Sequence, residues 1–167
     1  MRIAWLRDHP GHVEALAAAH VEAFGALEPG WTVADAAAGL RTHLRAETAI
    51  PCTLLALDAA GEWLGSVSLL DEDHPHIRQH RPWLASLYVR PSARGRGVGG
   101  ALVARARAEA AALGVSCLYL YCSGTVAHWY RHLGWREHER IALGPLHLQV
   151  MAIDCATAAW GRCAGPP

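Results

Sequence analysis

The chain has 167 residues, 52% of them hydrophobic and 18% charged, which predicts one globular domain with a sizeable core. Fifteen acids are balanced by fifteen basic residues, all of them arginine, so the net charge of zero implies no general affinity for nucleic acid or for a membrane surface. The N-terminus lacks the apolar core of a signal peptide, and no apolar run reaches transmembrane length.

The cysteines favour a reducing compartment. Their number is odd and no C-x-x-C pair occurs, so neither a disulfide framework nor a redox motif is indicated. Cys117 and Cys122 are expected on opposite faces of one strand and should not pair with each other. Free thiols and a cytoplasmic location are the simplest interpretation.

Apolar periodicity and turn residues give the expected elements in chain order. Helices are expected at 12–24, 32–45, 98–113 and 125–133. Strands are expected at 2–6, 52–57, 63–70, 84–89, 115–122, 135–142 and 146–153. The strand at 115–122 is almost wholly apolar, which predicts a central position with both faces buried.

The resulting order is β-α-α-β-β-β-α-β-α-β-β, which predicts an α/β fold with a mixed, largely antiparallel central sheet flanked by helices. No internal repeat or linker interrupts it, so residues 1–155 are expected to form a single domain. Residues 156–167 are rich in Ala, Gly and Pro and are expected to form a loosely ordered tail.

One segment, residues 84–103, carries the clearest chemical signal. A strand stops at Pro91, a loop follows, and a helical pattern begins at Val98. The loop contains Arg94 and Arg96 among several glycines, immediately before a helix start. Unpaired N–H groups, the helix dipole and fixed positive charge all favour an anion, and the glycines allow close approach. We therefore expect a pyrophosphate site here.

The glycines can be aligned with two different motifs. Gly95-x-Gly97-x-x-Gly100 matches the dinucleotide fingerprint, and a nicotinamide- or flavin-dependent enzyme is one alternative. That motif wants its first glycine directly after the strand and an acid about 20 residues later, and neither condition is met. In the other register, Arg94-x-x-Gly97-x-Gly99 resembles the [Q/R]-x-x-G-x-[G/A] signature of the GNAT superfamily of N-acetyltransferases.

The resemblance to GNAT enzymes implies the GNAT-type fold, acetyl-CoA as co-substrate and transfer of an acetyl group to a primary amine. It implies that the loop binds the coenzyme pyrophosphate and that the preceding strand offers its backbone to the pantetheine arm. The coenzyme-binding residues that it implies are Leu87, Tyr88, Val89, Arg94, Gly95, Arg96, Gly97, Val98, Gly99, Gly100 and Ser123. Ser123 stands where the family often has an asparagine.

A second stretch, from Trp129-Tyr130 to Gly134-Trp135, resembles the family's F-Y-x-x-x-G-F segment. The resemblance makes Tyr130 the counterpart of the tyrosine that protonates the departing thiolate. A buried tyrosine with a purely structural role is the alternative. Direct transfer is expected, since no cysteine is paired with a recognisable activating histidine and Cys122 near His128 is only a faint candidate.

The general base and the acceptor are open from sequence. Asp71, Glu72 and Asp73 are candidates for the base, with ordered water or a merely solvated acidic turn as alternatives. Trp31 is a candidate acceptor contact. The acceptor is expected to be a small-molecule or peptide amine, and a homodimer is possible, as is common among such enzymes. A catalytically silent acyl-CoA sensor or partner module is the alternative function.

The histidines suggest a metal only weakly. His74, His76 and His80 lie close together beside acids, but their spacing is no recognised zinc pattern. We therefore expect no metal cofactor and a solvated polar turn instead.

Overall fold

The computed structural model describes residues 1–155, so the predicted tail at 156–167 lies outside the described residues. The strands are β1 Arg2–Trp5, β2 Cys52–Leu57, β3 Trp63–Leu70, β4 Trp83–Val89, β5 Cys117–Ser123, β6 Arg136–Leu143 and β7 Leu146–Asp154. The α-helices are α1 Val13–Phe24, α2 Val33–Thr42, α3 Val98–Ala112 and α4 Gly124–His132. Short 3₁₀ turns flank α1 and precede the loop before α3. The predicted order and fold class are confirmed.

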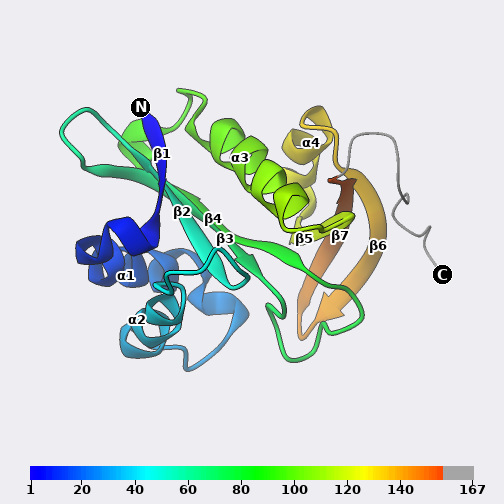
Figure 1. Cartoon of the computed structure of the whole chain (residues 1–167). Helices are drawn as coiled ribbons and strands as arrows, with labels where there is room; N and C mark the ends of the chain where they lie inside the picture. The colour runs from blue at the N-terminus through cyan, green and yellow to red at the C-terminus, as the bar shows by residue number, and fades with distance from the viewer. Residues whose placement is uncertain (156–167) are drawn as a thin grey trace.

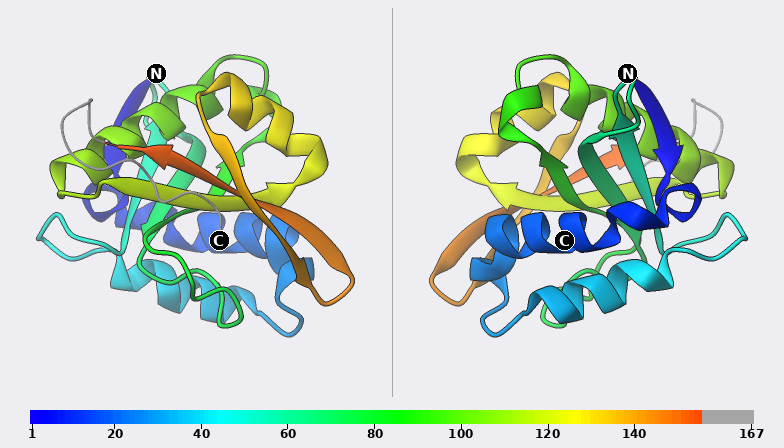
Figure 2. Two further views of the ribbon diagram at one scale, coloured as in Figure 1. Left: turned by 90° about the vertical axis from the view of Figure 1, so that its right-hand side faces the viewer. Right: turned by 90° about the vertical axis from the view of Figure 1, so that its left-hand side faces the viewer.

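The seven strands form one sheet in the order β1-β2-β3-β4-β5-β7-β6. Among the strand pairs of residues 1–155, only the central pair β4–β5 is parallel. Helices α1 and α2 cover one face of the sheet, and α3 and α4 cover the other (Figures 1 and 2). No helix among residues 1–155 is long and apolar enough to cross a membrane.

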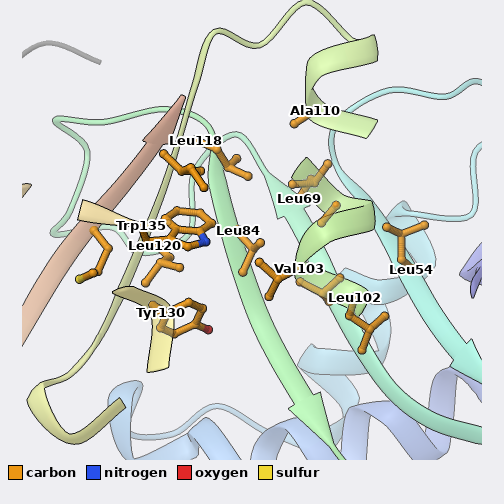
Figure 3. Packing of buried hydrophobic residues seen from close by; sticks show 14 of the residues in the cluster. Leu54, Leu69, Leu84, Leu102, Val103, Ala110, Leu118, Leu120, Tyr130 and Trp135 are labelled. Carbon is orange, nitrogen blue, oxygen red and sulfur yellow. The ribbon is translucent and has the colours of Figure 1, made fainter. Parts of the chain in front are cut away.

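Two large apolar clusters fix this layering. Under α3 and α4, Leu102 and Val103 pack with strand residues such as Leu69, Leu118 and Leu120 (Figure 3). Under α1 and α2, a separate cluster joins the helices to Leu55 and Leu57 of β2. Because opposite faces of β2 supply both clusters, the strand is buried along its whole length.

A capping box fixes the start of α2. Thr32 is the N-cap residue and forms a capping box with Asp35, in which the Asp35 N–H donates to Thr32 Oγ1 at 3.2 Å and the Thr32 N–H donates to Asp35 Oδ2 at 3.0 Å. The Thr32 hydroxyl, which donates to Asp35 Oδ2 at 2.6 Å, and to a smaller extent the Thr32 N–H, lower the pKa of Asp35, so its carboxyl is ionised at neutral pH.

The thiols follow the prediction in part. Cys52, Cys122 and Cys155 are free. Cys117 is disulfide-bonded, so the expectation of free thiols is wrong for this residue.

Gly65 allows the backbones of β3 and β4 to meet closely. A Cβ at this position would lie 2.6 Å from the Tyr88 carbonyl oxygen and 3.2 Å from Leu102 Cδ1. We expect Gly65→Ala to lower the free energy of unfolding by about 2 kcal/mol, the usual cost of overpacking a core. Urea denaturation measures it. Gly39→Ala, in mid-helix with nothing within 4 Å, is the control and should stabilise slightly; equal effects at the two sites would contradict the close-contact argument.

Candidate active site

The two central strands part from each other after a single register pair. Trp83 of β4 faces Tyr119 of β5, and no later pair joins the two strands. Opposite this point, the β3–β4 register shifts between Ser66 and Ser68, and Ser86 adopts a left-handed backbone with φ of 50°. Such a bulge bends its strand. The parting leaves the β5-facing edge of residues 87–89 without a strand partner among the described residues, as the coenzyme prediction requires.

The parting also explains where the prediction for β5 is wrong. Residues 118–120 are buried as expected. Tyr121 and Cys122 are only partly buried and Ser123 is exposed, since β4 no longer covers their side of the sheet. An apolar run alone carried no sign of this opening.

The loop between β4 and α3 has the geometry of an anion site. Gly95 and Gly97 adopt positive φ angles of 71° and 77°. Gly97 is the N-cap residue of α3, and no side chain caps the helix. The N–H groups of the first turn therefore remain open to a ligand, at the positive end of the helix dipole.

The arginines around this loop divide into engaged and available ones. Arg90 donates to the Trp63 carbonyl oxygen at 3.2 Å and its guanidinium lies over the Trp63 ring. Arg94 Nε donates to the Val89 carbonyl oxygen at 3.0 Å, which fixes its side chain against the end of β4. Arg96 is exposed and has no polar partner among the described residues. Arg96, on the loop itself, is therefore available to bind an anionic ligand.

A cleft of about 710 Å³ adjoins the parted strands. It is lined from both faces of the sheet, by α1, α2 and the loop between them, by the ends of β3 to β5, and by α4. Of the residues predicted to bind the coenzyme or to act in catalysis as the proton donor, Leu87, Ser123 and Tyr130 line it. Trp31, the predicted acceptor contact, lines it as well. The structure therefore brings the expected thioester end and the expected acceptor side together.

Tyr130 extends from α4 into the wall of this cleft and is buried, with 6% of its surface exposed. Figure 3 shows it in the same cluster as Leu120 and Trp135. Its hydroxyl has no hydrogen-bond partner among residues 1–155. Burial, with a smaller effect from neighbouring Cys122, raises the pKa of Tyr130, so the hydroxyl keeps its proton at neutral pH.

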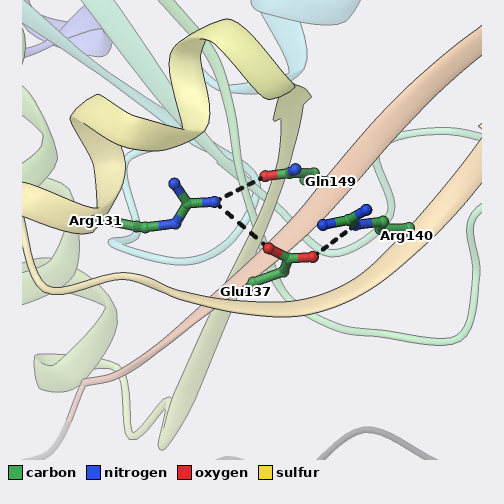
Figure 4. A network of polar contacts seen from close by, with 4 residues as sticks. All are labelled: Arg131, Glu137, Arg140 and Gln149. Carbon is green, nitrogen blue, oxygen red and sulfur yellow. Dashed lines mark hydrogen bonds and ion pairs between the residues drawn. The ribbon is translucent and has the colours of Figure 1, made fainter.

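Polar contacts hold α4 on the last hairpin (Figure 4). Arg131, next to Tyr130, donates to Glu137 at 3.4 Å and to Gln149 at 3.5 Å, and Arg140 Nε donates to Glu137 at 2.8 Å. These exposed pairs add little free energy.

Ser123 is the last residue of β5 and the N-cap residue of α4, and its side chain makes no capping hydrogen bond. Its hydroxyl lies 2.9 Å from the Thr125 hydroxyl, so it keeps hydrogen-bonding capacity at the cleft.

The three acids before β4 have different surroundings. Asp71 and Glu72 are exposed and form ion pairs with Arg81, at 3.1 Å for Asp71. Asp73 is partly buried and lines the cleft beside Tyr121. Burial raises the pKa of Asp73, and the Tyr121 hydroxyl offsets part of that rise. Of the three predicted candidates for the base, only Asp73 faces the cleft.

The nearby histidines fold the loop at 71–82. The His76 N–H donates to His74 Nδ1 at 3.2 Å, and His80 Nε2 lies 2.7 Å from Glu139 Oε1. Among residues 1–155 no group of three or more His, Cys, Asp or Glu side chains could hold a metal ion.

The sequence did not indicate a polar layer in the wall of the cleft, where histidines of α1 and the end of α2 meet hydroxyls of the sheet. His20 Nε2 lies 2.9 Å from the Ser66 hydroxyl, while His43 Nδ1 lies 2.7 Å from the Thr53 hydroxyl, which in turn lies 2.8 Å from that of Ser68. Burial lowers the pKa of both histidines to about 4, so both are uncharged at neutral pH. Their only sequence signal was a polar residue within an apolar helical face, which is common and unspecific.

The parted sheet, the anion loop at the start of α3 and the adjoining cleft together define an acyltransferase that uses coenzyme A. Comparison with known families agrees: the model described as "Acetyltransferase (GNAT) family" matches residues 11–135. The chain belongs to this family, and acetyl-CoA is its co-substrate. No curated protein sequence matches the chain.

Solved structures share the fold at low sequence identity. An aminoglycoside 6′-N-acetyltransferase complexed with coenzyme A is 15% identical, with a TM-score of 0.74 over 95% of this chain and 99% of that one. A chimera of spermidine N-acetyltransferase SpeG from Vibrio cholerae and hSSAT is 17% identical, with a TM-score of 0.69 over 92% and 95%. A GNAT-family acetyltransferase from Staphylococcus aureus Mu50 is 13% identical, with a TM-score of 0.68 over 93% and 100%.

Proposed function

We propose that this protein transfers the acetyl group of acetyl-CoA directly to a primary amine that carries a second positive charge. The cleft supports this acceptor class. Three carboxylates line the cleft, those of Glu28, Asp35 and Asp73, and no arginine lines it. Three histidines line it as well: His74, and His20 and His43, of which the last two are neutral because burial lowers the pKa of each to about 4. Such a field favours a cation.

Two of these carboxylates, those of Asp35 and Asp73, have shifted pKa values, and the shifts suit different tasks. Asp35 is held ionised by its capping box and lies at the cleft, where it can face a permanently charged group. Asp73 has a raised pKa and can accept a proton from the attacking ammonium. A diamine presents both a group to be deprotonated and a group that stays charged. The aminoglycoside and spermidine acetyltransferases named above act on amines of this kind, which supports the proposal by analogy of fold.

The transfer follows from this placement. The pyrophosphate binds the loop from Arg94 to Gly100, and the pantetheine arm lies along residues 87–89. The neutral amine attacks the thioester carbonyl carbon and forms the carbon–nitrogen bond, the carbon–sulfur bond breaks, and the Tyr130 hydroxyl gives its proton to the departing sulfur. The new amide nitrogen loses its surplus proton to solvent, and solvent returns a proton to Tyr130. Direct transfer is supported by the Cys122 thiol, whose pKa burial raises to about 11, so that it is a poor nucleophile at neutral pH.

The test compares the acetylation of 1,4-diaminobutane with that of butylamine. The rate is measured by the release of the CoA thiol, and the product is identified by its mass. Acetylation of the diamine with a kcat/KM at least tenfold higher supports the proposal. Equal kcat/KM values for the two amines would show that the acceptor needs no second positive charge. Binding of acetyl-CoA with no acetylation in a broad amine panel would instead favour the silent sensor module.

For Asp73→Asn we expect kcat/KM to fall about 100-fold, the usual scale of general-base catalysis. In the native protein, activity should fall with decreasing pH through the raised pKa of Asp73, because the protonated carboxyl cannot accept a proton. The variant should lose this dependence. Asp71→Asn, on an exposed side chain paired with Arg81, is the control. An unchanged pH profile in Asp73→Asn would assign proton removal to ordered water.

A further inference from the structure

The loop between β3 and β4, residues 71–82, extends from the cleft to β6 (Figure 1). Its Ile77 side chain is 2% exposed and packs on the sheet in an apolar cluster with Trp83, Tyr119 and Val150. The loop is therefore packed against strands β4, β5 and β7. We call it the β3–β4 strap.

His80 fixes the far end of the strap. Its Nε2 atom lies 2.7 Å from Glu139 Oε1, its ring stacks on Tyr119 with centroids 4.6 Å apart, and the His138 ring meets it edge-on at 4.6 Å. Gln79 Nε2 donates to the same Glu139 oxygen at 3.0 Å. Burial raises the pKa of Glu139, but the bonds from Gln79 and His80 outweigh it and lower the pKa. The ionised carboxylate only accepts, so both side chains donate to it.

A bulge in β6 makes this contact possible. The register between β6 and β7 shifts between Glu137 and Glu139, so His138 is the extra residue of the bulge. In a regular strand two neighbouring side chains point to opposite faces, whereas His138 and Glu139 both contact His80. Only 13% of the His80 side chain is exposed. The far end of the strap is therefore enclosed between β5 and β6.

The other end of the strap carries Asp73, which lines the cleft together with His74. The Tyr121 hydroxyl on β5 donates to Asp73, and the charged or titratable groups that face it are His74 beside it and Glu28 between α1 and α2. The Ile77 N–H donates to the His74 carbonyl oxygen at 3.0 Å. A hydrogen-bonded turn therefore follows directly after Asp73 and links it to the buried part of the strap.

We propose that His80 is a positioning residue for the transfer, because it holds Asp73 at the cleft through the β3–β4 strap. His80 is not among the residues that line the cleft, so it acts through the strap and not on the acceptor. This inference rests on the proposed role of Asp73 as the base. Loss of the His80 contacts loosens the strap, lets water reach Asp73 and displaces its carboxylate from the attacking amine.

The experiment is the pH profile of kcat/KM for the native protein, His80→Ala and Asp73→Asn, with 1,4-diaminobutane as the acceptor. In the native protein activity should fall at low pH through the raised pKa of Asp73, and Asp73→Asn should remove this fall. In His80→Ala water reaches the carboxyl, so its pKa should drop and the fall should move to lower pH by about half a unit or more. Displacement of the base should lower kcat about tenfold and leave the dissociation constant for acetyl-CoA within about twofold.

Three further variants separate this role from a general loss of folding. Glu139→Ala removes the acceptor of His80 and should give the same shift, so it serves if His80→Ala does not fold. Glu139→Gln keeps an oxygen acceptor and should restore the native profile. Arg81→Ala removes only the exposed ion pairs that the strap makes with its own Asp71 and Glu72, and it should leave the profile unchanged.

The outcomes are distinguishable. A loss of activity in His80→Ala without a shift of the profile would mean that His80 only stabilises the fold, and would overturn the proposal, as would an equal shift in Arg81→Ala. If the fall at low pH persists in Asp73→Asn, the assignment of the base fails, and this proposal with it. If the fall disappears in Asp73→Asn but is unmoved in His80→Ala, the base stands and the positioning role alone fails.

Discussion

Gly97→Glu is expected to abolish measurable binding of acetyl-CoA, with an affinity loss of at least 100-fold. Gly97 is the N-cap residue of α3, with φ of 77°, at the point where the N–H groups of the first turn open toward the ligand. A carboxylate there would occupy the anion's place and repel the pyrophosphate at short range. Calorimetry with acetyl-CoA, CoA and NADH measures the effect. NADH should bind neither protein.

The chain offers a matched control for backbone strain. Gly114, just beyond the other end of α3, has φ of 81° and, like Gly97, no atom within 4 Å of a hypothetical Cβ. Gly114→Glu therefore carries the same penalty for a side chain at positive φ, about 1 kcal/mol or more of stability. It should leave acetyl-CoA binding unchanged. If both variants bind acetyl-CoA within threefold of the native protein, the loop is not the pyrophosphate site.

Tyr130→Phe is expected to lower kcat at least 100-fold while the dissociation constant for acetyl-CoA stays within twofold. The substitution removes one hydroxyl that has no partner among residues 1–155, so packing and stability should change little. What is lost is the donor to the departing sulfur, an interaction made as charge develops. Steady-state kinetics with the best amine, alongside calorimetry, separates the two quantities.

Tyr119→Phe provides the comparison. Tyr119 lies on β5 in a different apolar cluster and does not line the cleft. Its loss of a hydroxyl should leave kcat within a factor of two. Unchanged turnover in Tyr130→Phe would assign Tyr130 a structural role and leave thiolate departure to solvent.

The sequence predicted well whatever depends on local pattern. The strand, loop and helix around Gly97 follow from an apolar run, a proline, clustered glycines and helical spacing. The α4 segment with Tyr130 follows from its resemblance to a family motif. Both were found because their residues are neighbours along the chain.

The acceptor side depends on contacts between distant segments. His20 meets Ser66, and His43 meets Thr53, only because α1 and α2 lie on the same face of β2 and β3. The bulge at Ser86 has no periodic signature, since a serine with positive φ looks like any other strand residue. Without that bulge the parting of the strands, and with it the exposure of Tyr121, could not be inferred.

The single register pair between Trp83 and Tyr119 has a mechanical consequence. Apart from the apolar cluster under α3 and α4, it is the register pair that joins strands β1 to β4 to strands β5 to β7. A coenzyme arm lying between them would act as an additional strand and brace the two groups of strands against each other. Binding of acetyl-CoA is therefore expected to raise the resistance of the protein to heat and to proteolysis.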